Sequence, residues 1–158
     1  MEKPIICVDF DGVIHSYENG WQNGHIYGTV VPGFFEWVES VKDEFKIVVY
    51  SSRSADPELK NRMITWLYIR YMEWTGDIKY IPNINIVDMN IDDFNTNIVI
   101  VKADIDKFNA IFSFSDTKPA AFITIDDRAL RFNGDWAAPK FTPQALKEFK
   151  PWTQNNAV

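Results

Sequence analysis

The sequence predicts an α/β protein built on a parallel sheet, and two observations lead to that prediction. First, short apolar runs rich in β-branched residues recur at 5–8, 46–50 and 121–125. Unbroken runs of this kind are typical of strands that are buried on both faces of a parallel sheet. Second, segments with helical spacing lie between the first runs, and strands that alternate with helices favour a parallel arrangement.

The N-terminal elements are predicted as follows. The first strand covers 5–8 and stops at Asp9, and residues 13–31, with three glycines and several aromatic residues, form a loop or a short hairpin. A helix follows Pro32-Gly33, because an apolar stripe recurs there at helical spacing. The stripe consists of Phe34, Trp37, Val38, Val41 and Phe45.

The next strand covers 46–50 and ends at Ser51. Asp56 and Pro57 then have the residue types that helices prefer at the N-cap and the first position, and Gly76 is suited to end that helix. Its buried face is predicted to contain Leu59, Met63, Trp66, Leu67, Tyr71 and Trp74.

The last third of the chain is less regular. Residues 77–110 are predicted as a small insertion, with strands at 84–87 and 98–101 around an acidic loop that contains Asp92 and Asp93. The core pattern resumes at 111–114, continues in the strand at 121–125, and ends with a short helix at 143–149. We therefore expect one domain, 1–158, with the insertion as a small cap or a simple elaboration.

Composition narrows the classes of protein. The chain has 158 residues, of which 46% are hydrophobic, and a net charge of −6. Surfaces that bind extended nucleic acid are usually basic, so none is expected here. The first apolar run is too short for a signal peptide and no run approaches a membrane span, which predicts a cytoplasmic protein without a membrane partner. The single cysteine, Cys7, fits a reducing compartment and a buried strand position.

Polar side chains follow three of the apolar runs. Asp9 and Asp11 follow the first, Ser51 the second, and Asp126-Asp127 the last. Ligands of parallel α/β sheets bind at the carboxyl ends of the strands, so these residues are expected to meet in one crevice. Alternation near the strand end places Asp9 and Asp11 on a common side, where a cation or a proton would relieve their repulsion.

Each of these features also has a plainer interpretation. Asp9 to Gly12 can form a solvated turn, and Asp126 or Asp127 can pair with Arg128 or cap a turn. Taken together, the two acidic pairs predict a site for Mg²⁺, which prefers oxygen ligands. Zinc fits poorly, because His15 and His25 lack the spacing of zinc ligands.

In combination, these motifs resemble the four ordered motifs of the haloacid-dehalogenase-like superfamily. They are Asp9-Phe10-Asp11-Gly12-Val13, Ser51 after a strand, Lys118, and Asp126-Asp127 after another strand. The resemblance covers residues 5 to about 128. Within the superfamily, the chain is most similar to short members from phages and bacteria. It implies a Rossmann-like three-layer sandwich and a Mg²⁺-dependent phosphatase that forms an aspartyl-phosphate.

The resemblance also implies a role for each residue. Asp9 would be the nucleophile and a metal ligand, and Asp11 the general acid and base, with its backbone carbonyl on the metal. Asp126 would be a further ligand, and Asp127 would ligate the metal or orient its water. Ser51 and Lys118 would hold the phosphoryl oxygens. Lys102 is a second candidate for the lysine, because only eight positions separate Lys118 from Asp126.

Ser52, Arg53 and Arg128 follow the motif residues and are candidates for substrate binding, although either arginine can instead pair with the aspartates. The expected substrate is a small phosphorylated molecule, and a nucleotide and the terminal phosphate of a nucleic acid are both compatible with the motifs. The alternatives are a phosphotransferase of the same fold and a non-catalytic domain that binds a nucleotide or a partner. A receiver domain is disfavoured, because the strand after the first helix ends in Ser51 rather than an aspartate.

Overall fold

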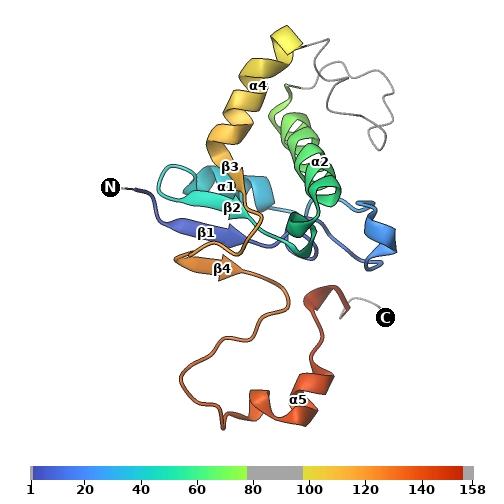
Figure 1. Ribbon diagram of the computed structural model, residues 1–158, viewed down its shortest axis with the longest axis vertical. Coiled ribbons are helices and arrows are strands. Elements are labelled where there is room, and N and C mark those ends of the chain that lie inside the picture. The colour runs from blue at the N-terminus through green and yellow to red at the C-terminus, as the bar shows by residue number, and fades with distance from the viewer. Residues whose placement is uncertain (1, 78–97, 155–158) are drawn as a thin grey trace.

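The computed structural model describes residues 2–77 and 98–154, without the side chains of 98–102. Four parallel strands form its sheet, in the spatial order β3-β2-β1-β4 (Figure 1). They are β1 (Ile5–Val8), β2 (Lys46–Val49), β3 (Phe112–Phe114) and β4 (Ile123–Ile125). The prediction of an α/β fold with a parallel sheet is thus confirmed.

The order of the strands creates a switch point beside β1. From β1 the chain moves outward to β2 and β3 on one side, and then returns to place β4 on the other side of β1. In the register of the sheet, Val8 is paired with Val49 of β2 and with Ile125 of β4. The residues that follow β1 and β4 therefore emerge next to each other at the carboxyl edge.

Three helices pack on the sheet: α1 (Phe34–Val41), α2 (Pro57–Thr75) and α4 (Ile98–Ile111). The ends of α2 are as predicted, since Asp56 Oδ1 accepts hydrogen bonds from the backbone N–H groups of Glu58 and Leu59, and Gly76 ends the helix in the left-handed conformation. Short 3₁₀ turns lie at Gln22–Gly24, Ser52–Ala55, Pro139–Phe141 and Trp152–Gln154.

The core lies between these helices and one face of the sheet. Alternate strand residues, Ile6 and Val8 among them, join helix residues such as Val38, Leu67 and Phe108 in one buried cluster. Residues 115–122 cross from β3 past β2 and β1 to β4 (Figure 1). They pass over the opposite face, to which Cys7 points. Burial there raises the pKa of the Cys7 thiol, and the nearby positive charge of Lys118, on the crossing segment, opposes this effect.

Four predictions differ from the structure. Trp74, predicted on the buried face of α2, is 43% exposed, and β4, predicted to be buried on both faces, is exposed along its length because it lies at the edge of the sheet. All the described helices that pack on the sheet lie on one face, so the described residues form two layers where three were expected. The predicted strand at 98–101 is wrong, because these residues begin α4. Apolar residues recur every three or four positions from Ile98 through Ile105 to Phe108, and this helical period prevails over the β-branched composition of the first turn. The predicted strand at 84–87, with Asp92 and Asp93, falls outside the described residues.

After β4 the chain leaves the sheet and forms a small lobe that contains α5 (Pro143–Glu148) (Figure 1). The lobe then returns to the sheet domain, where the indole N–H of Trp152 donates a hydrogen bond to the backbone carbonyl of Gly12 at 2.7 Å. None of the described helices has the length and apolar character needed to cross a membrane.

Candidate acidic site at the strand ends

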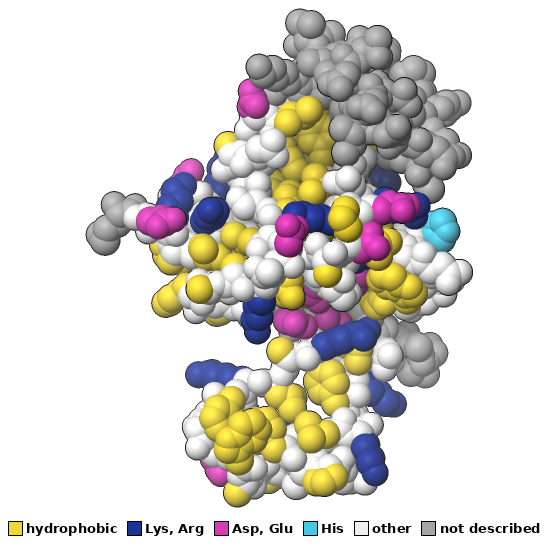
Figure 2. Space-filling model, in the orientation of Figure 1, with side chains coloured by type: hydrophobic (Ala, Val, Ile, Leu, Met, Phe, Trp, Pro, Cys, Tyr) yellow, Lys and Arg dark blue, Asp and Glu magenta, His cyan; other side chains and the backbone are white. Residues whose placement is uncertain are grey.

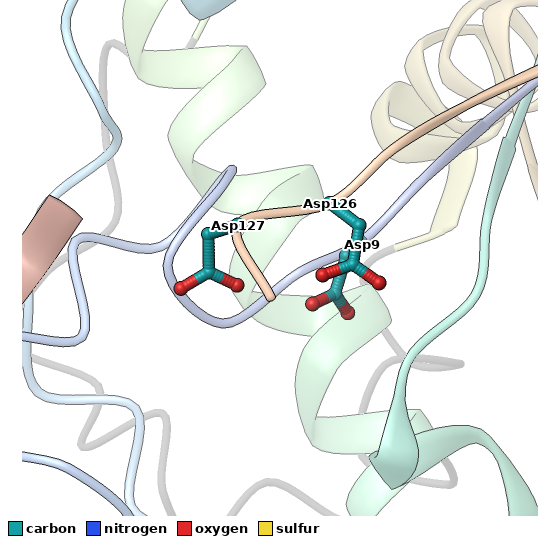
Figure 3. Close-up of side chains that lie close together, drawn as sticks. All are labelled: Asp9, Asp126 and Asp127. Carbon is teal, nitrogen blue, oxygen red and sulfur yellow. The ribbon is translucent and has the colours of Figure 1, made fainter. Parts of the chain in front are cut away.

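Three carboxylates meet at the switch point of the sheet. Asp9 follows β1 directly, and Asp126 and Asp127 follow β4, the neighbouring strand. One carboxylate oxygen from each residue lies within 4.8 Å of those of the other two. Figure 3 shows all three carboxylates pointing to the same side of the strand ends. The expected meeting of residues more than a hundred positions apart is therefore found for these three aspartates.

Asp9 is partly buried within this group. Burial raises the pKa of its carboxyl to about 7, against a hydrogen bond from the backbone N–H of Phe10 (2.8 Å) that lowers it. The charges of Asp126 and Asp127 raise the pKa of Asp9 further. Near neutral pH, Asp9 thus retains a proton in a substantial fraction of molecules unless a cation offsets the negative charge around it.

The side chain of Asp127 is enclosed by its surroundings. Its side chain is 1% exposed, and neither carboxylate oxygen has a hydrogen-bond partner among the described residues. The Nε atom of Arg128 lies 3.7 Å from Oδ2 of Asp127, which is too far for a hydrogen bond. Burial raises the pKa of Asp127, and the charge of Arg128 opposes that effect. A buried carboxylate without donors is costly, and a cation is one partner that would satisfy it.

Gly12 makes room for Asp127. A Cβ atom on Gly12 would lie 2.4 Å from Oδ2 of Asp127, and the residue has a φ of +82°. Both the close approach and the left-handed backbone favour glycine at this position. The glycine that ends the Asp9-Phe10-Asp11-Gly12 motif therefore lets the second acidic pair pack against the first loop.

Asp126 takes part in a turn as well as in the cluster. Its Oδ1 accepts a hydrogen bond from the backbone N–H of Arg128 at 2.7 Å. The side chain of Arg128 is about half exposed and lies over the ring of Tyr17. The predicted substrate-binding residue Arg128 is therefore close to the carboxylates and accessible to a ligand.

Asp11 points to different partners from Asp9. Its carboxylate accepts hydrogen bonds from Arg53 Nε (2.8 Å) and Nη2 (3.1 Å), and it contacts His15 Nδ1 at 2.9 Å. Burial works to raise the pKa of Asp11, but the hydrogen bonds from His15 and Arg53 outweigh it, so the pKa is lowered. The carboxylate is therefore ionised at neutral pH and lies outside the three-carboxylate group.

His15 is fixed in one tautomer by its surroundings. The backbone N–H of Gly28 donates to Nε2 at 2.9 Å, so Nε2 must be the unprotonated nitrogen. The proton is then on Nδ1, from which it is donated to Asp11. The sequence offered no signal for this contact beyond the closeness of His15 to the motif.

Arg53 is completely buried and links three segments of the chain. Besides its two bonds to Asp11, Nη1 donates to the backbone carbonyl of Gly24 at 2.7 Å. The guanidinium also lies 4.7 Å from the ring centroid of Trp21. Of the two roles considered for Arg53, the structure shows pairing with an aspartate, and a substrate could reach the guanidinium only if this ion pair opened.

The remaining predicted residues lie on three different segments of the chain. Ser51 follows β2 and is buried; its Oγ accepts from the backbone N–H of Arg53 (3.3 Å), and its own N–H donates to Ser54 Oγ (3.0 Å). Ser52 is exposed in the same 3₁₀ turn. Lys118 is exposed on the crossing segment, whereas Lys102 belongs to α4, and its side chain is outside the described part.

The arrangement combines a carboxyl whose pKa is raised to about 7 (Asp9), a buried carboxylate without donors among the described residues (Asp127), and an ionised carboxylate in a separate ion pair (Asp11). Asp9, Asp126 and Asp127 could together hold a divalent cation through oxygen atoms. Comparison of the chain with protein-family models, with curated proteins and with solved structures finds no match.

Proposed function

We propose that the protein is a Mg²⁺-dependent phosphatase of the haloacid-dehalogenase-like type, with a Rossmann-like fold and Asp9 as its nucleophile. One observation carries the proposal: three carboxylates converge at the switch point of a parallel sheet, and one of them, Asp127, is buried without a hydrogen-bond donor in the described part of the chain. A cluster of this kind gains most from a divalent cation, and phosphoryl transfer is the chemistry that such a cation commonly supports.

Asp9, Asp126 and Asp127 would hold the ion. Mg²⁺, when bound, supplies positive charge that shields the nucleophile from the anionic phosphoryl group. Arg128 lies beside the cluster and is exposed, so it can bind a phosphoryl oxygen from the open side. Ser51 and Lys118 keep the phosphate-binding roles that the resemblance implies for them.

The reaction proceeds in two displacements. In the first, a carboxylate oxygen of Asp9 attacks phosphorus, and the bond from phosphorus to the ester oxygen breaks, which leaves an aspartyl-phosphate and an alcohol or its anion. In the second, water attacks phosphorus, the bond to Asp9 breaks, and inorganic phosphate leaves. Asp9 is regenerated as a carboxylate.

In the hydrogen-bonded state that the structure shows, Asp11 is suited to act as a general base but not as a general acid. Because Arg53 and His15 keep its carboxylate ionised, it can accept a proton from the attacking water but carries none to give to a leaving group. Donation to a poor leaving group would first require Asp11 to gain a proton and leave Arg53. Aryl phosphates avoid this requirement, since their leaving group departs without protonation.

The test is release of phosphate from an aryl phosphate, with Mg²⁺ and with chelator, by the native chain and by Asp9→Asn. Asp43→Asn, at an exposed position outside the acidic group, is the matched control. We expect activity that needs Mg²⁺, disappears in Asp9→Asn and survives in Asp43→Asn. Activity that persists in Asp9→Asn would refute the nucleophile.

Two further measurements distinguish the alternatives. Equal release of aryl alcohol and phosphate indicates hydrolysis, whereas an excess of alcohol over phosphate in the presence of an added acceptor alcohol indicates a phosphotransferase. Asp11→Asn slows the second displacement, so mass spectrometry of that variant should find the chain heavier by one phosphoryl group. A folded native chain that turns over no phosphate ester favours a binding domain.

A further inference from the structure

Residues 128–150 differ in charge from the rest of the chain. They contain five basic residues, Arg128, Arg131, Lys140, Lys147 and Lys150, against two acidic ones, Asp135 and Glu148. The whole chain has 16 basic and 22 acidic residues. Although the protein as a whole has a net negative charge, it therefore contains one basic segment, which begins directly after Asp127 of the acidic site.

The same segment exposes aromatic rings. Trp136 is 75% exposed and Phe132 is 48% exposed, and their ring centroids lie 4.6 Å apart. Phe141 packs against both rings, at 5.2 Å from Trp136 and 5.8 Å from Phe132. Large aromatic side chains are rarely left this accessible without a ligand or a partner.

Basic and aromatic groups share one surface there. Figure 2 shows hydrophobic side chains gathered on the lower lobe with Lys and Arg side chains around them, and acidic side chains gathered where the lobe meets the sheet domain. Lys140 belongs to this surface, since its ammonium lies 5.2 Å from the centroid of the Phe141 ring. We call this surface, formed by residues 128–150, the basic aromatic surface.

Both ends of the basic aromatic surface meet the acidic site. Arg128 follows Asp127 directly and its Nε lies 3.7 Å from that carboxylate. At the other end, Trp152 donates its hydrogen bond to Gly12, the residue against which Asp127 packs. A ligand that lies along this surface would therefore have one end at the three carboxylates.

We propose that the basic aromatic surface binds a short single-stranded nucleic acid whose terminal phosphate enters the acidic site. Exposed rings offer stacking faces to bases, and lysine and arginine pair with backbone phosphates; single-stranded binding sites combine these two features. The acidic remainder of the protein limits contact to a few nucleotides, in agreement with the absence of an extended basic surface in the sequence. The catalytic part of this inference rests on the proposed phosphatase function.

The charge pattern favours this ligand over a second copy of the chain. Symmetric pairing with a second copy would bring two of these basic surfaces face to face, and apolar pairing alone gives no role to five basic residues. An anionic lipid surface shares the charge and aromatic preferences, but it presents no single chain end to the carboxylates at the edge of the surface.

The test is fluorescence anisotropy of a labelled single-stranded oligonucleotide of about eight residues with a terminal phosphate. It is performed with Asp9→Asn in the presence of Mg²⁺, so that turnover is prevented while a cation can offset the charge of the remaining carboxylates. Removing a stacked ring costs about 1–3 kcal/mol, so adding Trp136→Ala should weaken binding about 5- to 150-fold. Trp74→Ala, which removes a tryptophan that is 43% exposed on α2, should leave it unchanged.

A second pair of variants tests the charge. Lys147→Gln with Lys150→Gln should reduce the dependence of log affinity on log salt by roughly 1.4, since each phosphate contact on a single strand contributes about 0.7. Lys42→Gln, beyond the end of α1, is the control. Urea unfolding of each variant shows whether it is folded.

Three outcomes would overturn the inference: no binding of the oligonucleotide at low salt, equal loss in the Trp74 and Trp136 variants, or binding of anionic vesicles in its place. None of them affects the aryl phosphatase test. Conversely, a chain that binds the oligonucleotide through Trp136 but hydrolyses no aryl phosphate contradicts the proposed function and leaves the binding surface in place. The two proposals therefore fail separately.

Discussion

The buried ion pair between Arg53 and Asp11 gives the sharpest prediction of stability. Arg53→Met keeps an unbranched chain of similar length but removes the donors to Asp11 Oδ2, Asp11 Oδ1 and the Gly24 carbonyl. The Asp11 carboxylate would then be buried with His15 as its remaining partner. Removing one member of a buried ion pair leaves an uncompensated charge, which costs about 3–5 kcal/mol.

Urea unfolding at neutral pH, followed by tryptophan fluorescence, would measure this loss. Arg62→Met is the matched control, because Arg62 pairs with Glu58 on an exposed face of α2 and such pairs contribute less than about 1 kcal/mol. Adding Asp11→Asn to Arg53→Met removes the orphaned charge. The double variant should therefore be more stable than the sum of the single losses predicts, by about 1–3 kcal/mol.

A loss for Arg53→Met no larger than that for Arg62→Met would refute this account of the site. It would mean that Asp11 finds water or another donor when the guanidinium is gone, and that the pair is not what positions Asp11. Additive effects in the double variant would lead to the same conclusion from an independent measurement.

Two further predictions concern the acidic group. The raised pKa of Asp9, about 7 when folded against about 4 unfolded, gives stability that is complete below the unfolded pKa and lost as pH rises through the folded pKa. In chelator the free energy of unfolding should thus fall between about pH 4 and pH 7, by up to about 4 kcal/mol. Asp9→Asn should remove most of this dependence of stability on pH. An unchanged slope in Asp9→Asn would contradict the prediction. Gly12→Ala should destabilise the chain by more than 1 kcal/mol and abolish Mg²⁺ binding in titration calorimetry, because its Cβ would overlap Asp127. Gly134→Ala has the same backbone strain with nothing within 4 Å of its Cβ, so equal effects of the two variants would exclude a role for the overlap.

The sheet and the strand-end residues could be predicted because their signals are local. Four apolar residues ending at Asp9 define β1, and Asp56-Pro57 with Gly76 define both ends of α2. The order β3-β2-β1-β4 explains why the ends of β1 and β4 meet. Parallel strands alone did not specify which of the polar strand ends would be neighbours.

The pairing of Arg53 with Asp11 was one of two roles that the sequence left open, because 42 positions separate the residues and an arginine after a strand fits either. The second helical layer was expected only because the motifs resemble those of a superfamily with a three-layer fold. Only eight positions separate Lys118 from Asp126, however, so the connection to β4 has room for a crossing segment and not for a helix. The α4 error arose from a four-residue β-branched run considered without the ten helical residues that follow it.

The alternation rule placed Asp9 and Asp11 on a common side, yet the two carboxylates have different partners. β1 ends at Val8, and Gly12 with its positive φ turns the chain, so Asp9 faces Asp126 and Asp127 while Asp11 faces Arg53. The consequence is chemical: burial among carboxylates raises the pKa of one aspartate, and hydrogen bonds from cationic and imidazole groups lower the pKa of the other. Without a bound cation, the carboxyl that retains a proton near neutral pH is therefore that of Asp9 and not that of Asp11. Any cation that binds at Asp9 must therefore displace the proton held there, whereas Asp11 is ionised whether or not a cation is bound.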